Sequence, residues 1–354
     1  MPVRMKDIAR DLGVSVVTVS KVLRNHSDIS EETRERVLAR IKEVDYRPNI
    51  AARSLVTGRT YLVGVVVPSL LHPFFAEIAK AISETLRQRG YYLIISSSEE
   101  DPELEEQEIN HLLERRLDTL IIASCRTSVD LFQRIERENT PYILIDRSFK
   151  GLAANFVGVD DEAVGELATQ HLIDIGCKRI AHIRGPETSP GMERLRGYKR
   201  TLERNGMKVL SEYVIAEPKG DVDTRQRGAE AMRTLLRLNP RPDAVFCFND
   251  PLAIGAMNCI LGEGLRIPED VALIGCGNLN YDDTLRVPLS SVDQRSRQIG
   301  EETARVALNI LTSKKPPAVE TIILKPQLVA RASTQQAGKS AVNQTVFSSE
   351  SHRN

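Results

Sequence analysis

Side chains near the N-terminus have types and spacing that suit the recognition of DNA. One short expected helix carries hydroxyl, valine and lysine side chains on its outer face: Ser15, Val16, Val17, Thr18, Ser20 and Lys21. Hydroxyls and backbone amides suit phosphate oxygens. A lysine can donate to guanine acceptors, and valine can contact a thymine methyl group. A three-helix bundle with a solvated polar face would show the same pattern, so both interpretations stay open at this point.

A second group of candidates lies further along the chain, where polar or aromatic side chains directly follow expected apolar strands. Its members are His72, Phe74, Phe75, Asp146, Arg147, Asn249 and Gly277. In parallel sheets, ligands bind beyond the carboxyl ends of the strands. Carboxylates and amides hydrogen-bond to hydroxyls, and a phenylalanine ring can stack on a sugar or a purine. The alternatives are that the aspartate and asparagine only cap the next turn or helix, and that the phenylalanines are core; spacing does not choose between Phe74 and Phe75.

Patterns typical of catalysis, metal binding or cofactor binding are missing from the sequence. There is no G-x-x-x-x-G-K-[ST] loop, and no G-x-G-x-x-G opens the first strand–helix turn. The six histidines are scattered, without metal-ligand spacing or an evident nucleophile partner. The five cysteines form no C-x-x-C pair, which argues against a disulfide framework and a zinc site. We therefore expect neither an enzyme nor a cofactor.

Charge is divided unevenly along a chain whose formal net charge is zero. Residues 1–60 hold 12 Lys or Arg against 8 Asp or Glu, and the remainder holds 36 against 40. A basic head on a slightly acidic body suits a polyanionic partner at one end only. The N-terminus has no apolar signal region, and no run of about 18 apolar residues appears, so we expect a cytoplasmic protein.

The elements that position these candidates fall into four segments. Residues 1–47 are expected to form three short helices around one small core, because apolar residues recur at helical spacing between Gly13, Ser15 and Pro48. Residues 48–60 form a connector. Residues 61–334 alternate apolar runs with amphipathic helices, which predicts parallel sheets covered on both faces. Residues 335–354 are polar and are expected to form a disordered tail.

Seven strands are expected in the large segment: 61–67, 91–95, 119–123 and 142–145 in one set, and 179–183, 244–248 and 271–275 in a second. From the pattern alone, one open sheet or two lobes of similar construction are both possible.

The motif Gly13-Val14-Ser15-Val16-Val17-Thr18-Val19-Ser20, followed by Tyr46-Arg47-Pro48-Asn49, resembles the head of the LacI/GalR family of bacterial repressors. The resemblance extends from residue 5 to about residue 333. It implies a helix-turn-helix whose second helix lies in the major groove, and a dimer on a near-palindromic operator. It also implies a body like that of periplasmic sugar-binding proteins, with two α/β lobes and a ligand in the cleft. We therefore favour two lobes.

The resemblance implies a further DNA contact in the connector, which becomes a hinge helix on DNA in the family. The residues concerned are Asn49, Ala52, Arg53 and Leu55. Small residues let two such helices approach closely, and Leu55 would wedge into the minor groove and kink a base step. The alternative is that Leu55 is a linker residue packed on the larger domain.

Arg194 and Gly277 carry the resemblance into the ligand site. Arg194 lies three residues before Gly197-Tyr198, matching the family's Arg-x-x-Gly-Tyr, whose arginine contacts the effector in relatives. A guanidinium supplies a rigid fork for paired hydroxyls or a carboxylate, so Arg194→Ala is expected to weaken ligand binding and leave ligand-free DNA binding nearly unchanged. Many relatives have an acid where this chain has Gly277, which argues against an ordinary hexose held by an acid at that position.

The sequence thus predicts a homodimeric transcription repressor whose operator affinity is controlled by a small ligand, with a sugar or sugar derivative expected. A transport binding protein would share the body but would need a signal peptide and no DNA-binding head. The tail after Thr334 contains no leucine, so no coiled-coil seam is available for a tetramer. The sequence does not identify the ligand, the operator, or whether the ligand releases DNA or promotes binding.

Overall fold

A computed structural model describes residues 3–23, 26–46, 54, 58–126, 128–216 and 223–335 of the chain. The chain divides into two compact units, Met1–Tyr61 and Leu62–Asn354. Most of the expected connector, including Asn49, Ala52, Arg53 and Leu55, and nearly all of the expected tail lie outside the described residues. No helix of the described residues has the length and apolar character needed to cross a membrane.

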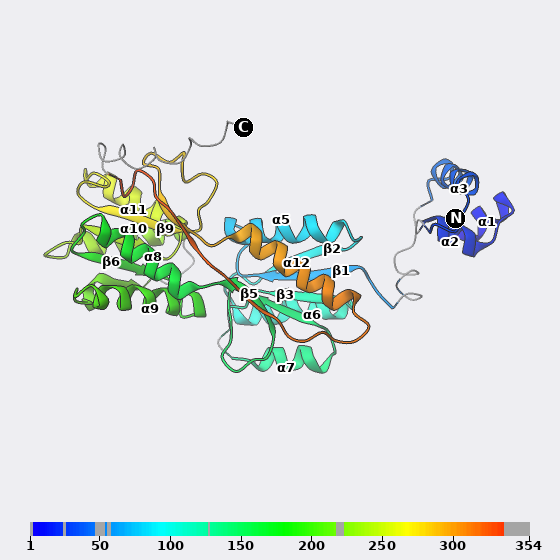
Figure 1. The fold of residues 1–354 in the computed structure, drawn as a ribbon, viewed down its shortest axis with the longest axis horizontal. Helices are drawn as coiled ribbons and strands as arrows, with labels where there is room; N and C mark the ends of the chain where they lie inside the picture. Colours follow the sequence, from blue (N-terminus) through cyan, green and yellow to red (C-terminus); the bar gives the residue numbers. More distant parts are fainter. Residues whose placement is uncertain are drawn as a thin grey trace, which may run out of the picture. The chain divides into compact units, whose positions relative to one another are not determined.

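Between residues 3 and 46, the described part of the N-terminal unit forms three helices, α1 (Met5–Leu12), α2 (Val16–Leu23) and α3 (Glu31–Glu43) (Figure 1). The turn between α1 and α2 contains Gly13 at a φ of 65°, a left-handed conformation that favours glycine. The side chain of Ser30 accepts a hydrogen bond from the Thr33 amide at 3.3 Å and so caps α3. Their apolar faces meet in a small core of Ile8, Ala9, Val19, Val22 and Val37. The expected three-helix head is confirmed.

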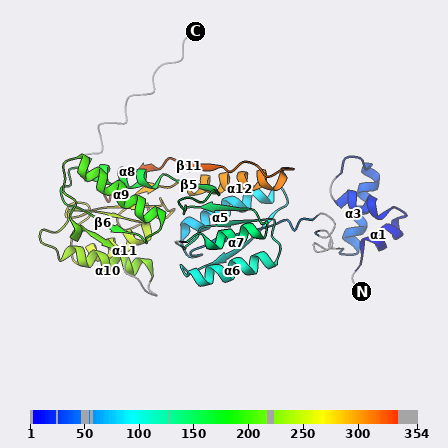
Figure 2. The same cartoon turned by 90° about the horizontal axis from the view of Figure 1, so that it is seen from below.

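The C-terminal unit consists of two lobes, each built on one six-stranded sheet (Figures 1 and 2). The sheet of the first lobe has the order β11-β5-β4-β3-β1-β2, and that of the second lobe has the order β12-β10-β9-β8-β6-β7. All neighbours pair in parallel except β10 and β12. The first sheet comprises β1 (Leu62–Val67), β2 (Tyr92–Ser97), β3 (Thr119–Ile122), β4 (Tyr142–Ile145), β5 (Asn155–Val159) and β11 (Thr321–Leu324). The second comprises β6 (Ile180–Arg184), β7 (Val214–Ala216), β8 (Ala244–Cys247), β9 (Ala272–Cys276), β10 (Ser290–Asp293) and β12 (Gln327–Val329).

Helices cover both faces of each sheet, so the central strands are buried nearly throughout. The first lobe carries α5 (Pro73–Arg87), α6 (Pro102–Glu114), α7 (Asp130–Arg137) and α12 (Ser296–Thr312). The second carries α8 (Asp161–Asp174), α9 (Ser189–Arg204), α10 (Thr224–Leu236) and α11 (Asp250–Gly262). Parallel strands buried on two faces need continuous apolar runs, and β1, with Val63 and Val65 to Val67 buried, is typical. The structure confirms the expected two lobes; the alternative, one open sheet, is not found.

The chain passes between the lobes three times: from β5 to α8, from β10 to α12, and from β11 to β12. The helix α12 therefore packs beside α5 in the first lobe although it follows the second lobe in sequence (Figures 1 and 2). The close approach depends on Gly300, where a β-carbon would lie 2.6 Å from the carbonyl oxygen of Ile78. The two sets of strands expected from the sequence put each lobe in one continuous part of the chain. In the structure, α12 and β11 return to the first lobe and β12 returns to the second, so each lobe is built from separate parts of the chain.

Candidate functional sites

The outer face of α2 presents two exposed valines at the start of the helix. Val16 is 45 % exposed and Val17 is 61 % exposed, while Val19 and Val22 on the opposite face lie in the core. The Ser15 hydroxyl accepts a hydrogen bond from the Thr18 amide at 3.0 Å and lies 2.9 Å from the Thr18 hydroxyl, so it caps α2 and fixes this face. The structure thus brings the six candidates from Ser15 to Lys21 onto one short helix.

Lys21 is held by an ion pair within the N-terminal unit. Its ammonium group donates a hydrogen bond to the carboxylate of Asp28 in the turn before α3. This hydrogen bond lowers the pKa of Asp28 below its usual value. Asp28 therefore engages one of the three N–H donors of this ammonium group, a contact that the sequence did not reveal.

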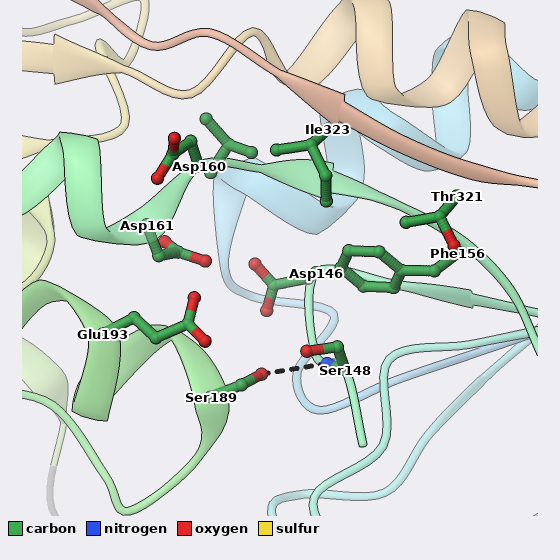
Figure 3. Close-up of a pocket in the computed structure, with 10 residues that line it drawn as sticks. Asp146, Ser148, Phe156, Asp160, Asp161, Ser189, Glu193, Thr321 and Ile323 are labelled. Atoms are coloured by element: carbon green, nitrogen blue, oxygen red, sulfur yellow. Dashed lines mark hydrogen bonds between the residues drawn. The ribbon is translucent and has the colours of Figure 1, made fainter. Parts of the chain in front are cut away.

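A recess in the C-terminal unit lies between the two lobes, beyond the carboxyl ends of β4 and β5 (Figure 3). Its volume is about 300 Å³. The lining comes from the loop after β4, from β5 and β11, and from the first turns of α8 and α9. The residues are Asp146, Ser148, Phe156, Val159, Asp160, Asp161, Ser189, Glu193, Thr321 and Ile323. The expected location of a ligand, at strand ends between lobes, coincides with this recess.

Asp146 is the one sequence candidate that lines the recess directly. It follows β4 with a φ of 61°, and it is only 9 % exposed. Its nearest described cation is Arg147, whose Nε lies 3.7 Å from its carboxylate, too far for a hydrogen bond. Burial raises the pKa of the Asp146 carboxyl, because the ionised form loses water that nothing fully replaces.

Arg147, also a candidate, is engaged inside the first lobe. Its two terminal nitrogens donate to the carboxylate of Glu100 at 2.7 and 3.0 Å, and one of them also donates to the Ser124 carbonyl at 3.2 Å. It does not line the recess. Its position one residue after Asp146 could not show this, because consecutive residues point in different directions.

Arg194 is buried, and it is hydrogen-bonded to three protein groups. Its Nε donates to Asp161 at 2.8 Å, and its terminal nitrogens donate to the Phe248 carbonyl at 2.7 Å and to Gln294 at 2.6 Å. The guanidinium lies 4.5 Å from the centre of the Phe248 ring. It therefore joins α8, α9, the loop after β8 and the loop after β10, which are elements of one lobe and its crossings.

Asp161 is the carboxylate partner of Arg194, and the sequence did not single it out. It lines the recess at the start of α8 and is almost completely buried. Burial raises its pKa to about 7 even though Arg194 opposes the shift. A buried carboxylate that depends on one guanidinium is costly to leave unpaired.

His72 and Asn249 meet across the lobes. The Asn249 side-chain nitrogen lies 3.3 Å from His72 Nε2, and the Asn249 side-chain oxygen accepts from the Leu252 amide at 2.9 Å and caps α11. Burial lowers the pKa of His72 to about 4, so the ring is neutral near pH 7 and Nε2 can accept the hydrogen bond. Asn249 thus serves both as the helix cap and as a contact between lobes.

Phe74 and Phe75 lie in the first turn of α5 and are buried. Both rings meet the His72 ring edge to face, with centroids 6.3 and 5.7 Å away. Neither lines the recess. They support His72 in the core, which is the alternative that the sequence left open.

Gly277 leaves room for a buried carboxylate from another element. A β-carbon at Gly277, which has a φ of 141°, would lie 2.7 Å from the carboxylate of Asp250. Asp250 accepts from the Ser291 hydroxyl at 2.7 Å, and it shares the Leu279 amide with Asp282. Burial and mutual repulsion raise the pKa of this pair, so the two carboxyls favour sharing one proton. Many relatives carry an acid at position 277; in this chain, Asp250 occupies the space that such a side chain would need.

In the described part of the chain, no group of three or more His, Cys, Asp or Glu side chains is placed to hold a metal ion.

The recess lining also includes Ser148, Asp160, Ser189, Glu193 and Thr321, which the sequence analysis missed. Asp160 directly follows a strand, and that signal could have identified it. Ser189 and Glu193 on α9, and Thr321 on β11, reach the recess only because of how these elements pack in three dimensions.

Comparison with known proteins gives matches over almost the whole chain. Residues 4–49 match the model of bacterial regulatory proteins of the lacI family, and residues 60–331 match that of periplasmic binding proteins and the sugar binding domain of the LacI family. The regulator DegA of Bacillus subtilis is 31 % identical, covering 94 % of this chain and 98 % of that protein. The ribose operon repressor of Escherichia coli is 32 % identical, covering 87 % and 93 %. A structure of the Lac repressor dimer bound to operator and an anti-inducer is 27 % identical with a TM-score of 0.81, covering 95 % and 100 %.

Proposed function

The chain belongs to the LacI family of bacterial regulatory proteins, and on that premise we propose that a small hydroxylated ligand in the interlobe recess controls how tightly α2 holds an operator. The protein is a DNA-binding transcriptional regulator. The observation that carries the DNA-binding part is the capped α2 with two exposed valines at its start, since the leading residues of a recognition helix contact base edges. Residues 1–47 would read the major groove and residues 48–60 would join them to the body as a hinge helix.

Ligand control requires that the two body conformations bind the ligand differently. The recess is lined from both lobes, with Asp146 from the first and Glu193 from the second. A ligand that contacts both would favour the closed arrangement. The change of angle would be passed through β1 to the connector and alter the spacing of the two DNA-binding heads. A repressor in the cytoplasm, without enzyme activity, fits these features and the named relatives.

Val17→Asp is expected to reduce specific DNA binding by at least about tenfold, because it replaces an exposed apolar contact with a charge beside phosphates. The measurement is gel-shift titration of the full chain against DNA from upstream of its own gene. Leu38→Asp is the matched control, since Leu38 is also an exposed apolar residue but lies on α3. Equal affinities of the Val17 variant and the wild type would remove α2 from the DNA interface.

A homodimer is the assembly expected for the DNA-binding form, because two-fold symmetry doubles the few contacts of one head. The edge strand β2 exposes Tyr92 and Ile95, which is an unusual surface for a monomer. Sedimentation velocity of the full chain should give a dimer, and deletion of residues 335–354 should leave it unchanged. A tetramer that survives this deletion would contradict the proposal, and so would a monomer at micromolar concentration.

A further inference from the structure

The recess carries four carboxylates, Asp146, Asp160, Asp161 and Glu193, and neither a lysine nor an arginine is among its lining residues. In Figure 3 the side chains of Asp146, Asp161 and Glu193 face a common space. Arg147 and Arg194 oppose part of this charge, since both act to lower the pKa of Asp146. Their hydrogen bonds go elsewhere, however: Arg147 donates to Glu100, and Arg194 donates to Asp161 among the lining carboxylates.

Two of these carboxylates lack a described hydrogen-bond donor. Asp160 accepts from the Ala163 amide at 2.9 Å, and Asp161 accepts from Arg194. Asp146, about nine-tenths buried, and Glu193, half-buried, accept no described hydrogen bond. Burial raises the pKa of Glu193, as it does that of Asp146. Buried carboxylates without donors are costly, so a ligand that supplies both donors and positive charge would relieve this cost.

The arrangement does not suit a metal ion. Asp146 comes from the loop after β4, Asp160 and Asp161 from the start of α8, and Glu193 from α9, and no cluster of described residues has the placement for a metal ion. Three hydroxyls, those of Ser148, Ser189 and Thr321, are interspersed among them. A ligand several atoms long, with an ammonium group and hydroxyls, would match carboxylates and hydroxyls spread around a cavity of about 300 Å³.

We propose that the effector is a hydroxylated organic cation of the amino sugar or amino alcohol class, held through its ammonium group by Asp146 and Glu193. This inference rests on the proposed function, because it takes the recess as the effector site. A neutral sugar could donate hydrogen bonds to these carboxylates but would leave their mutual repulsion uncancelled. A sugar acid or phosphate would add to the repulsion.

The first experiment compares matched pairs of ligands by thermal unfolding of the full chain at pH 7.5 and constant ionic strength. The probes are glucosamine against glucose, galactosamine against galactose, and N-acetylglucosamine, whose nitrogen is uncharged. At least one amine should raise Tm at millimolar concentration while its neutral counterpart does not. The proposal is overturned if the neutral member raises Tm as much, if no amine raises Tm, or if magnesium or calcium chloride alone does so.

The second experiment locates the effect at Glu193. For the amine that raises Tm, Glu193→Gln should weaken binding by at least about tenfold in calorimetry, because it removes a charge-assisted contact while keeping the side-chain volume. Glu203→Gln, an exposed position on the same helix α9, removes the same charge outside the recess and should leave the affinity unchanged. Equal dissociation constants for the two variants would refute the assignment.

Gel shift separates this inference from the proposed function. Without ligand, Glu203→Gln should bind promoter DNA as the wild type does, because Glu203 lies outside both the N-terminal unit and the recess. If the wild type binds DNA but only neutral sugars change that binding, the proposed function is supported and the cationic ligand is refuted. If the protein binds an amine but does not bind promoter DNA, the proposed function is refuted and the ligand class is supported.

Discussion

Arg194→Ala is expected to lower the free energy of unfolding of the C-terminal unit by about 3–5 kcal/mol, a range typical of a broken buried ion pair. The variant would leave the Asp161 carboxylate buried without its cation, and the Phe248 carbonyl and Gln294 without their donor. The measurement is urea unfolding followed by circular dichroism. The sequence-based prediction that the same variant weakens ligand binding stays a prediction, and the structure adds an expected loss of stability to it.

The control for Arg194→Ala is Arg196→Ala on the same helix. Arg196 is half-exposed and pairs with Glu162 at 3.1 Å, so its loss should cost less than about 1 kcal/mol. The double variant Arg194→Ala with Asp161→Ala should recover part of the lost stability, because it removes the orphaned carboxylate. A single Arg194→Ala variant within about 1 kcal/mol of the wild type would show that Asp161 finds another partner.

Gly277→Asp is expected to lower the free energy of unfolding by at least about 3 kcal/mol at pH 8, because it adds a third carboxylate to a buried pair. It also strains a backbone at a φ of 141° and puts a β-carbon 2.7 Å from Asp250. Gly277→Ala has the same backbone and contact cost without the charge. Thermal unfolding of both variants therefore separates steric from electrostatic effects.

The loss in free energy of unfolding caused by Gly277→Asp should be larger at pH 8 than at pH 5. Burial raises the pKa of Asp250 and Asp282 above unfolded values, so the folded state binds more protons there than the unfolded state. Stability from such groups is present at low pH and declines as pH rises through the folded pKa. A third carboxyl in this cluster should behave likewise, so the Asp variant should approach the Ala variant at pH 5. Identical deficits at pH 5 and pH 8 would contradict the account.

All of the predicted strands except the edge strand β2 are buried nearly throughout, and the missed strands lie at an edge of a sheet or lead into a passage between the lobes. β1, β3, β4 and β8 are mostly apolar and almost completely buried, which a parallel sheet covered on both faces requires. Five strands were not predicted. Of these, β10 reads Ser-Ser-Val-Asp, β7 and β12 have three residues each, and β11 alternates exposed and half-buried positions. Such strands are specified by their neighbours in the sheet and leave little local signal.

The sequence indicated the position of the recess better than its lining. Asp146 was singled out because it directly follows a buried strand, and it does line the recess. Arg147 and the Phe74–Phe75 pair shared that position but turn into the first lobe, since a rule about strand ends says nothing of side-chain direction. Glu193 was missed because it lies inside α9, far in sequence from the strand ends it faces. Its role depends on a contact between lobes that no local pattern encodes.

The three passages of the chain between the lobes restrict the mechanics of the body. Two bodies joined by one tether can slide, twist and separate, whereas three neighbouring links suppress translation and leave a bend as the softest motion. The links leave β5, β10 and β11 directly, and β5 and β11 are paired neighbours, so the bend is anchored in sheet hydrogen bonds at its ends. Little conformational entropy is then lost when the lobes close, because few arrangements existed beforehand. A ligand bound between the lobes would therefore act mainly on one bending motion, and would shift its equilibrium only by its difference in affinity for the bent and unbent arrangements.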